Sequence, residues 1–273
     1  MPKIPLLFIM LAVLAGCSER GLTPDDLPTR VPSVSAFATS EYLTAVAPPD
    51  GMRESVSFPN VDDNLVFLPN WRAEASFSFD GVFARTTRQV DVETSLTVWY
   101  NQLGNQRRVV IDGGGELFGD TETPRREAVR LGQDTFLLID DACLGDADGD
   151  AATLADLRLG DIIGGVTFAT PAGEQRVLHG RDVWRFSFDT ANIQLPLLRL
   201  GDEGRITGMQ SELWVARVEP DQNVVIRYYV NLEVENVVLR LFDSSLPLTG
   251  QLNLRYDLYD IGINPNITQP FGC

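Results

Sequence analysis

Hydrophobic and polar residues alternate along most of the chain after Trp71. An apolar residue at every second position is typical of a β-strand with one face in a core and the other in water. The clearest runs are Ala73–Phe79, Val92–Tyr100, Trp184–Phe188, Val224–Val234 and Leu252–Leu258, and shorter ones are Arg107–Ile111, Thr135–Ile139, Gln175–Leu178 and Glu212–Val218. Turn residues separate these runs, so the pattern predicts one large, mostly antiparallel sheet.

Helical periodicity is limited to two short segments. Ala152–Ile163 predicts a helix, and Ser35–Val46 predicts a second one that Pro48-Pro49 ends. The apolar side of the first helix is formed by Leu154, Leu157 and Ile162. Because so little helix cannot cover a large flat sheet, we expect a mainly β (α+β) fold: a curved antiparallel sheet or half-barrel with a few short helices covering its concave face. Periodicity leaves open whether the interior is a packed core or a cavity.

The N-terminal residues have the features of an export signal. Lys3 supplies one positive charge, and the apolar run Ile4–Leu14 is shorter than the roughly 20 residues that span a bilayer. The run ends in Leu14-Ala15-Gly16-Cys17, which resembles the bacterial lipobox, whose cysteine is acylated and becomes the first residue of the mature chain. The alternative is a plain secretory signal with an incidental cysteine. We expect a signal peptide at residues 1–16, a lipidated Cys17 with a flexible tether at residues 17–33, and a single β domain at residues 34–273.

Charge and the predicted anchor limit location and partners. Without residues 1–16 the chain has 21 arginines, no lysine and 38 acidic residues, which gives a net charge of 21 − 38 = −17. Such a charge argues against nucleic acid as a partner. The acyl chains on Cys17 would hold the protein on the extracytoplasmic side of a membrane in the cell envelope. No cofactor is expected, and a monomer is the expectation although the sequence does not determine the oligomeric state.

Two cysteines remain once Cys17 is assigned to the lipid. An even pair in an exported protein is typical of a disulfide, so Cys143 and Cys273 are predicted to be joined, with Cα atoms about 4.4 to 6.8 Å apart. The alternative is two separate free thiols.

Catalytic machinery is hard to find in this sequence. His179 is its only histidine, next to Gly180-Arg181 in an expected hairpin, and is interpreted as a surface turn residue. Carboxylate pairs such as Glu233/Glu235 and Asp257/Asp260 are expected on the solvated face of the sheet. Neither a Gly-x-Ser-x-Gly nor a His-Glu-x-x-His pattern occurs. We therefore expect no enzymatic activity.

Asp146, Asp148 and Asp150 are spaced like the first ligands of a calcium loop. Ala151 replaces the turn glycine of such a loop, and Leu157 replaces its bidentate glutamate. The three aspartates are therefore a weak metal candidate, and an acidic turn is the simpler interpretation.

The order of these segments resembles the LppX/LprAFG lipoproteins, which belong with the LolA- and LolB-like carriers. The resemblance lies in the lipobox and tether, the Leu-rich segment Leu154–Ile163, and the hairpin Gly180–Asp189 with its alternating aromatics. It continues through Gly208–Ala216 and Arg227-Tyr228-Tyr229, in the succession of broad strands. The acidic loop at Cys143 and the Cys273 terminus have no counterpart in the better-known members.

This resemblance implies a carrier that holds an acyl chain or glycolipid between sheet and helices. The strands have more apolar positions than the expected helices can cover, which is compatible with such a cavity. The residues expected to line it are Phe77, Phe79, Leu154, Leu157, Ile162, Trp184, Phe186 and Tyr228. The alternative is a structural or interaction lipoprotein of the envelope with a packed core and no ligand.

Overall fold

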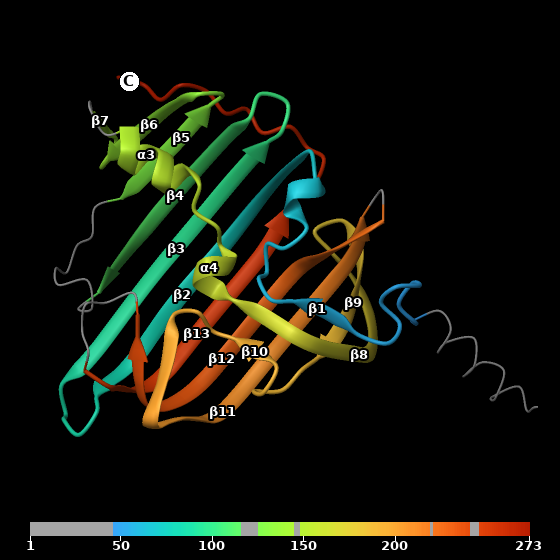
Figure 1. Ribbon diagram of the computed structural model, residues 1–273, viewed down its shortest axis with the longest axis vertical. Helices are drawn as coiled ribbons and strands as arrows, with labels where there is room; N and C mark the ends of the chain where they lie inside the picture. Colours follow the sequence, from blue (N-terminus) through green and yellow to red (C-terminus); the bar gives the residue numbers. More distant parts are fainter. Residues whose placement is uncertain (1–45, 116–124, 145–147, 219–220, 241–245) are drawn as a thin grey trace, which may run out of the picture. The chain divides into compact units, whose positions relative to one another are not determined.

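The computed structural model describes residues 46–115, 125–144, 148–218, 221–240 and 246–273 (Figure 1). The chain divides into two units, Met1–Tyr42 and Leu43–Cys273, and all described residues belong to the second. The predicted signal peptide, Cys17, the predicted tether and nearly all of the predicted helix Ser35–Val46 therefore lie outside the described residues.

In the described part of the chain, thirteen strands form one sheet in which neighbouring strands are antiparallel. They are β1 (Val56–Phe58), β2 (Asn70–Phe83), β3 (Gln89–Asn101), β4 (Gln106–Gly115), β5 (Arg126–Leu131), β6 (Asp134–Ile139), β7 (Ala142–Leu144), β8 (Gly165–Leu178), β9 (Arg181–Ser187), β10 (Ile193–Gln194), β11 (Leu198–Val218), β12 (Gln222–Leu239) and β13 (Leu248–Tyr259). Their order is β1-β8-β9-β11-β12-β13-β2-β3-β4-β5-β6-β7, with β10 also paired to β8. The predicted mainly β fold with a curved antiparallel sheet is confirmed.

The strands with the longest alternating runs form the centre of the sheet. Strands β12, β13, β2 and β3 pair over most of their length, which brings Tyr228, Tyr256, Ala75 and Leu96 directly opposite one another, all of them buried. We call the side that carries this row the inner face. The other side, which carries Glu74 on β2, is the outer face.

Strand β8 bends the sheet over its inner face. Its first residues pair with β1 and β10, whereas from Thr170 onward it pairs with β9, with a shift in register between Pro171 and Gln175. Figure 1 shows β1 and β8 crossing in front of β11–β13. The bend lets the sheet bury its own apolar side chains, which compensates for the small amount of helix.

The predicted single helix Ala152–Ile163 is wrong in its extent. The structure has two short helices here, α3 (Asp148–Ala155) and α4 (Gly160–Ile163), besides the 3-10 helix η2 (Leu65–Phe67). In the segment between α3 and α4, the carbonyl of Leu157 accepts a hydrogen bond from Arg107. Gly160 then packs so close to Asn60 and Asp62 that a Cβ would lie 2.3 Å from the nearest side-chain atom.

Both helices cover the inner face. Helix α3 contacts β4, β5 and β6, and α4 contacts β13. The residues Leu159 and Ile163 are fully buried in the same hydrophobic core as the strands. Short helices over a large curved sheet were the arrangement predicted from the apolar surplus.

Candidate functional site

The inner face brings all eight predicted ligand-contacting residues into one hydrophobic cluster. Phe77 and Tyr228 are 0% exposed, and Phe79 and Phe186 are 1% exposed. The other four, Trp184, Leu154, Leu157 and Ile162, are half-buried and pack against the same core. The sequence therefore identified a group of residues that lie together. That they contact a ligand stays a prediction.

Several polar atoms are buried in this apolar environment without a hydrogen-bond partner. They include the hydroxyls of Tyr228 and Tyr256, which lie directly opposite each other, and the indole Nε1 of Trp184. Burial raises the pKa of both tyrosines well above the usual value. The two phenols are therefore neutral donors in an apolar interior, where an unmatched polar group costs about 1 to 3 kcal/mol.

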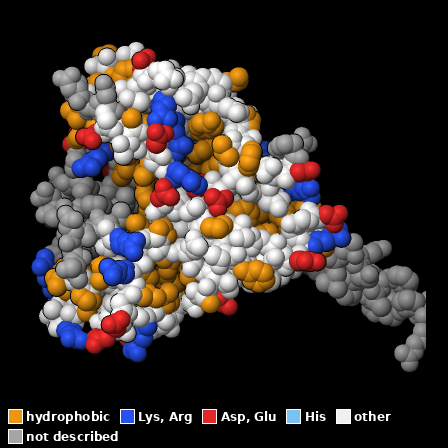
Figure 2. All heavy atoms as spheres, in the orientation of Figure 1, with side chains coloured by type: hydrophobic (Ala, Val, Ile, Leu, Met, Phe, Trp, Pro, Cys, Tyr) orange, Lys and Arg blue, Asp and Glu red, His pale blue; other side chains and the backbone are white. Residues whose placement is uncertain are grey.

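Charged residues gather where the α3–α4 segment crosses the end of the inner face. Arg130 makes a bidentate ion pair with Asp156, with N···O distances of 2.6 and 2.7 Å. Arg158 pairs with Asp62 at 3.3 Å. Figure 2 shows basic and acidic side chains side by side along this segment, next to hydrophobic ones.

Arg107 belongs to this charged group and sequence reasoning missed it. It lies directly opposite Arg130, and its guanidinium is 5.7 Å from the centre of the Trp71 ring. Burial is the main cause that lowers its pKa. A signal was present in the sequence, since Arg107 has the same parity as Val109 and Ile111 and so shares the inner face.

The outer face contains a second charged cluster, and here the prediction of a solvated Asp257 is wrong. The Asp257 side chain is only 3% exposed and accepts hydrogen bonds from Arg227 at 2.7 Å and Arg255 at 2.6 Å. The Nε2 atom of His179 lies 3.0 Å from the same carboxylate. His179 is in the predicted turn, between β8 and β9, but its imidazole also lies against the ring of Tyr259, with centroids 4.0 Å apart.

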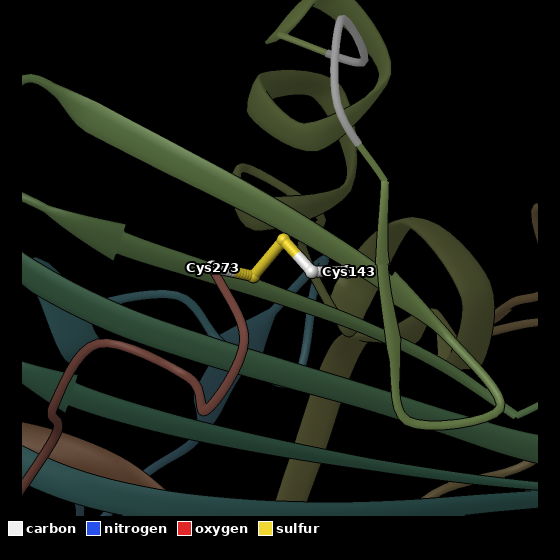
Figure 3. The surroundings of a disulfide bond; sticks show 2 residues. All are labelled: Cys143 and Cys273. Carbon is white, nitrogen blue, oxygen red and sulfur yellow. A yellow bond between two sulfur atoms is a disulfide. The ribbon is translucent and has the colours of Figure 1, made fainter.

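The predicted disulfide is confirmed. Cys143 in β7 and Cys273 at the C-terminus are bonded, with Cα atoms 5.4 Å apart (Figure 3). The C-terminal segment runs along the outer face, where Ile267 is buried and residues 266–271 line a cleft of about 480 Å³ with Arg108 and Glu127. The bridge therefore fastens this segment to the sheet.

The calcium candidate is only partly covered by the structure. Asp146 lies outside the described residues, while Asp148 and Asp150 belong to helix α3. Among the residues that can be described, no group of three His, Cys, Asp or Glu side chains is placed to hold a metal ion.

No helix within the described ranges is long and apolar enough to cross a membrane.

Comparison with solved structures finds a similarity to LprF from Mycobacterium bovis. The two chains are 14% identical, the TM-score is 0.37, and the match covers 85% of this chain and 98% of that chain. No family model and no curated protein matches the chain. A similarity of this degree carries no argument about function, and the resemblance to LppX/LprAFG lipoproteins stays a prediction.

Proposed function

We propose that this protein is a membrane-tethered extracytoplasmic lipoprotein that binds a lipid or other amphiphile between the inner face of its sheet and the helices α3 and α4. The binding is non-covalent and apolar, and no residue is assigned a chemical step. The Cys17 anchor places the protein at the membrane, where such ligands are present.

The pair of unmatched hydroxyls on Tyr228 and Tyr256 is the observation that carries this proposal. Two buried phenol donors in an apolar environment are suited to the ester, hydroxyl or carboxyl oxygens of an amphiphile, whose chains would bury methylenes at about 0.8 kcal/mol each. Their cover is thin, because α3 has eight residues and α4 has four. Displacing them means repacking their apolar side chains, including the buried Leu159 and Ile163, and opening the ion pairs of Asp156 and Asp62.

A structural or interaction lipoprotein is the second candidate. The nearly complete burial of Phe77, Phe79 and Phe186 favours it, because these side chains already pack as a core. The two candidates differ in whether protein purified from its host contains a ligand.

Lipid extraction from the non-acylated protein, residues 18–273, tests the choice. We expect mass spectrometry to detect a stoichiometric amphiphile in protein purified from its own host's membranes. In Leu157→Trp the larger side chain displaces two or more ligand methylenes, so recovery falls about tenfold. Circular dichroism checks that the variant is folded.

Leu103→Trp is the matched control, since Leu103 is 81% exposed in the turn between β3 and β4. We expect it to retain the wild-type amount of lipid. Ligand-free wild-type protein that shows no change in melting temperature with added lipid would instead support the structural candidate.

Cys17→Ser tests the tether. Because serine cannot form the thioether, we expect the variant to be released as a soluble protein or to remain an uncleaved precursor, whereas the wild type fractionates with membranes. Membrane fractionation and intact mass measure the change. Unchanged fractionation and mass would show that Cys17 is not the anchor.

A further inference from the structure

Arg107 is placed where a positive charge is hard to explain by stability alone. It makes no ion pair with any described residue, its NH2 group donates to the carbonyl of Leu157, and its Nε is buried without a hydrogen-bond partner. Directly opposite it on β5 is a second arginine, Arg130. Like charges opposite each other on a sheet are unfavourable, and so is a partly buried cation without a direct ion-pair partner.

The nearby carboxylates are already used by other arginines. Asp156 is held by both terminal nitrogens of Arg130, and Asp62 is paired with Arg158. Arg107 therefore differs from its neighbours, since no described carboxylate is within ion-pair distance of it and its buried Nε has no hydrogen-bond partner.

The surroundings of Arg107 connect this charge to the apolar interior. Its guanidinium lies over Trp71 and beneath Leu157, and β4 continues from it along the inner face through Val109 and Ile111. A group bound at Arg107 would thus have its chain directed along the same face as Tyr256 and Leu96. A cleft of about 680 Å³ is lined by Arg130 and Ala152 among others, on the Arg130 side of the arginine pair.

We propose that Arg107 binds the anionic head group, a phosphate or a carboxylate, of the amphiphile held on the inner face. This rests on the function proposed above and adds the head-group class. A guanidinium offers two parallel N–H donors to either oxyanion, and Arg130 contributes a second positive charge next to it. The bound anion would also give Arg107 the direct ion-pair partner that the described residues do not supply.

Three probes with the same chain and different head groups test the proposal: dodecanoate, dodecyl phosphate and dodecanol. Each is titrated into the full chain, purified from its host in a non-ionic detergent at one fixed concentration, with the fluorescence of Trp71 and the other tryptophans as the signal. We expect at least one anionic probe to bind about tenfold more tightly than dodecanol, the factor typical of one charge-assisted hydrogen bond. A preference for dodecyl phosphate indicates that the bound amphiphile has a phospholipid-like head group. A preference for dodecanoate indicates a fatty-acid-like one.

Arg107→Gln should remove the preference for anions, measured as the ratio of anion affinity to dodecanol affinity within the same variant. Arg107→Lys keeps the positive charge but lacks the two parallel N–H donors of a guanidinium, so it should keep part of the preference. This variant tests the proposal even if Arg107→Gln does not fold. Arg199→Gln is the control, because Arg199 is exposed on β11 and has no ion pair among the described residues. It should keep the full preference.

Two results would overturn the assignment of Arg107. One is equal affinity of the wild type for all three probes, and the other is an undiminished preference for anions in both Arg107 variants. In either case dodecanol still binds and the proposed function survives. Failure of all three probes, dodecanol included, would contradict the proposed function itself.

Discussion

The double variant Cys143→Ser/Cys273→Ser is expected to lose about 4 to 5 kcal/mol of unfolding free energy, the chain-entropy value for opening a loop of more than a hundred residues. The bridge joins residues that are 130 positions apart, so the loop it closes contains α3, α4 and β8 to β13. For a domain of this size the melting temperature should fall by roughly 10 to 20 °C. Differential scanning calorimetry of the non-acylated protein measures it.

Ala142→Ser is the matched control for the disulfide variant, since Ala142 is an exposed neighbour of Cys143 in β7. It should melt within about 2 °C of the wild type. Alkylation of the unreduced exported protein provides the independent check, because a bridged pair leaves no free thiol. Two labelled cysteines, or a double variant that melts like the control, would contradict the expected stabilisation.

Alternation predicted those strands that have one buried face and one solvated face. The runs Ala73–Phe79, Val92–Tyr100 and Leu252–Leu258 lie inside β2, β3 and β13. Strand β5 was missed because Glu127, Ala128 and Val129 are buried in succession. The C-terminal segment covers the outer face there, and a strand covered on both sides loses the period of two.

The helical region shows why local patterns did not give correct boundaries. Leu154, Leu157 and Ile162 pack against the core, so the apolar side of the predicted helix was identified correctly. Between α3 and α4 the chain contacts residues far away in sequence, since the Leu157 carbonyl accepts a hydrogen bond from Arg107, fifty residues earlier. Periodicity within the segment contains no information about that contact.

The candidate site was predicted in its apolar part and not in its polar part. Alternation assigned Phe77, Phe186 and Tyr228 each to the buried face of a strand, and the family resemblance grouped them into one expected site. Alternation does not tell which buried polar atoms remain without hydrogen-bond partners, such as the hydroxyls of Tyr228 and Tyr256. The unmatched hydroxyls and the position of Arg107 therefore emerge only in the folded protein.

Asp257 was assigned to the solvated face because it alternates with the buried Tyr256 and Leu258. That parity is correct, since Asp257 does lie on the outer face opposite Glu74. The β8–β9 hairpin covers the position, with His179 at Asp257 and Arg181 donating to the carbonyl of Ile261. A cover supplied by a segment almost eighty residues away cannot be inferred from alternation.

Asp257→Ala is expected to lower the unfolding free energy by about 3 to 5 kcal/mol, because removing one member of a buried ion pair leaves its partners without a counter-charge. Arg227, whose side chain is only 25% exposed, would bear most of this cost, while Arg255 can turn toward solvent. The β8–β9 hairpin should also loosen, since it loses the contact of His179. Chemical denaturation measures the first effect, and faster hydrogen exchange of the amides near His179 measures the second.

Glu74→Ala is the comparison that isolates burial as the cause. Glu74 is directly opposite Asp257 on β2 and also pairs with an arginine, Arg72, but its side chain is 42% exposed. An exposed pair contributes about 0 to 1 kcal/mol, so this variant should be nearly as stable as the wild type and exchange normally in the hairpin. Similar losses in both variants would mean that the Asp257 carboxylate has no special role. A large loss in Asp257→Ala alone, with faster exchange confined to the hairpin, is the result expected of a buried carboxylate that fastens β8 and β9 to the outer face.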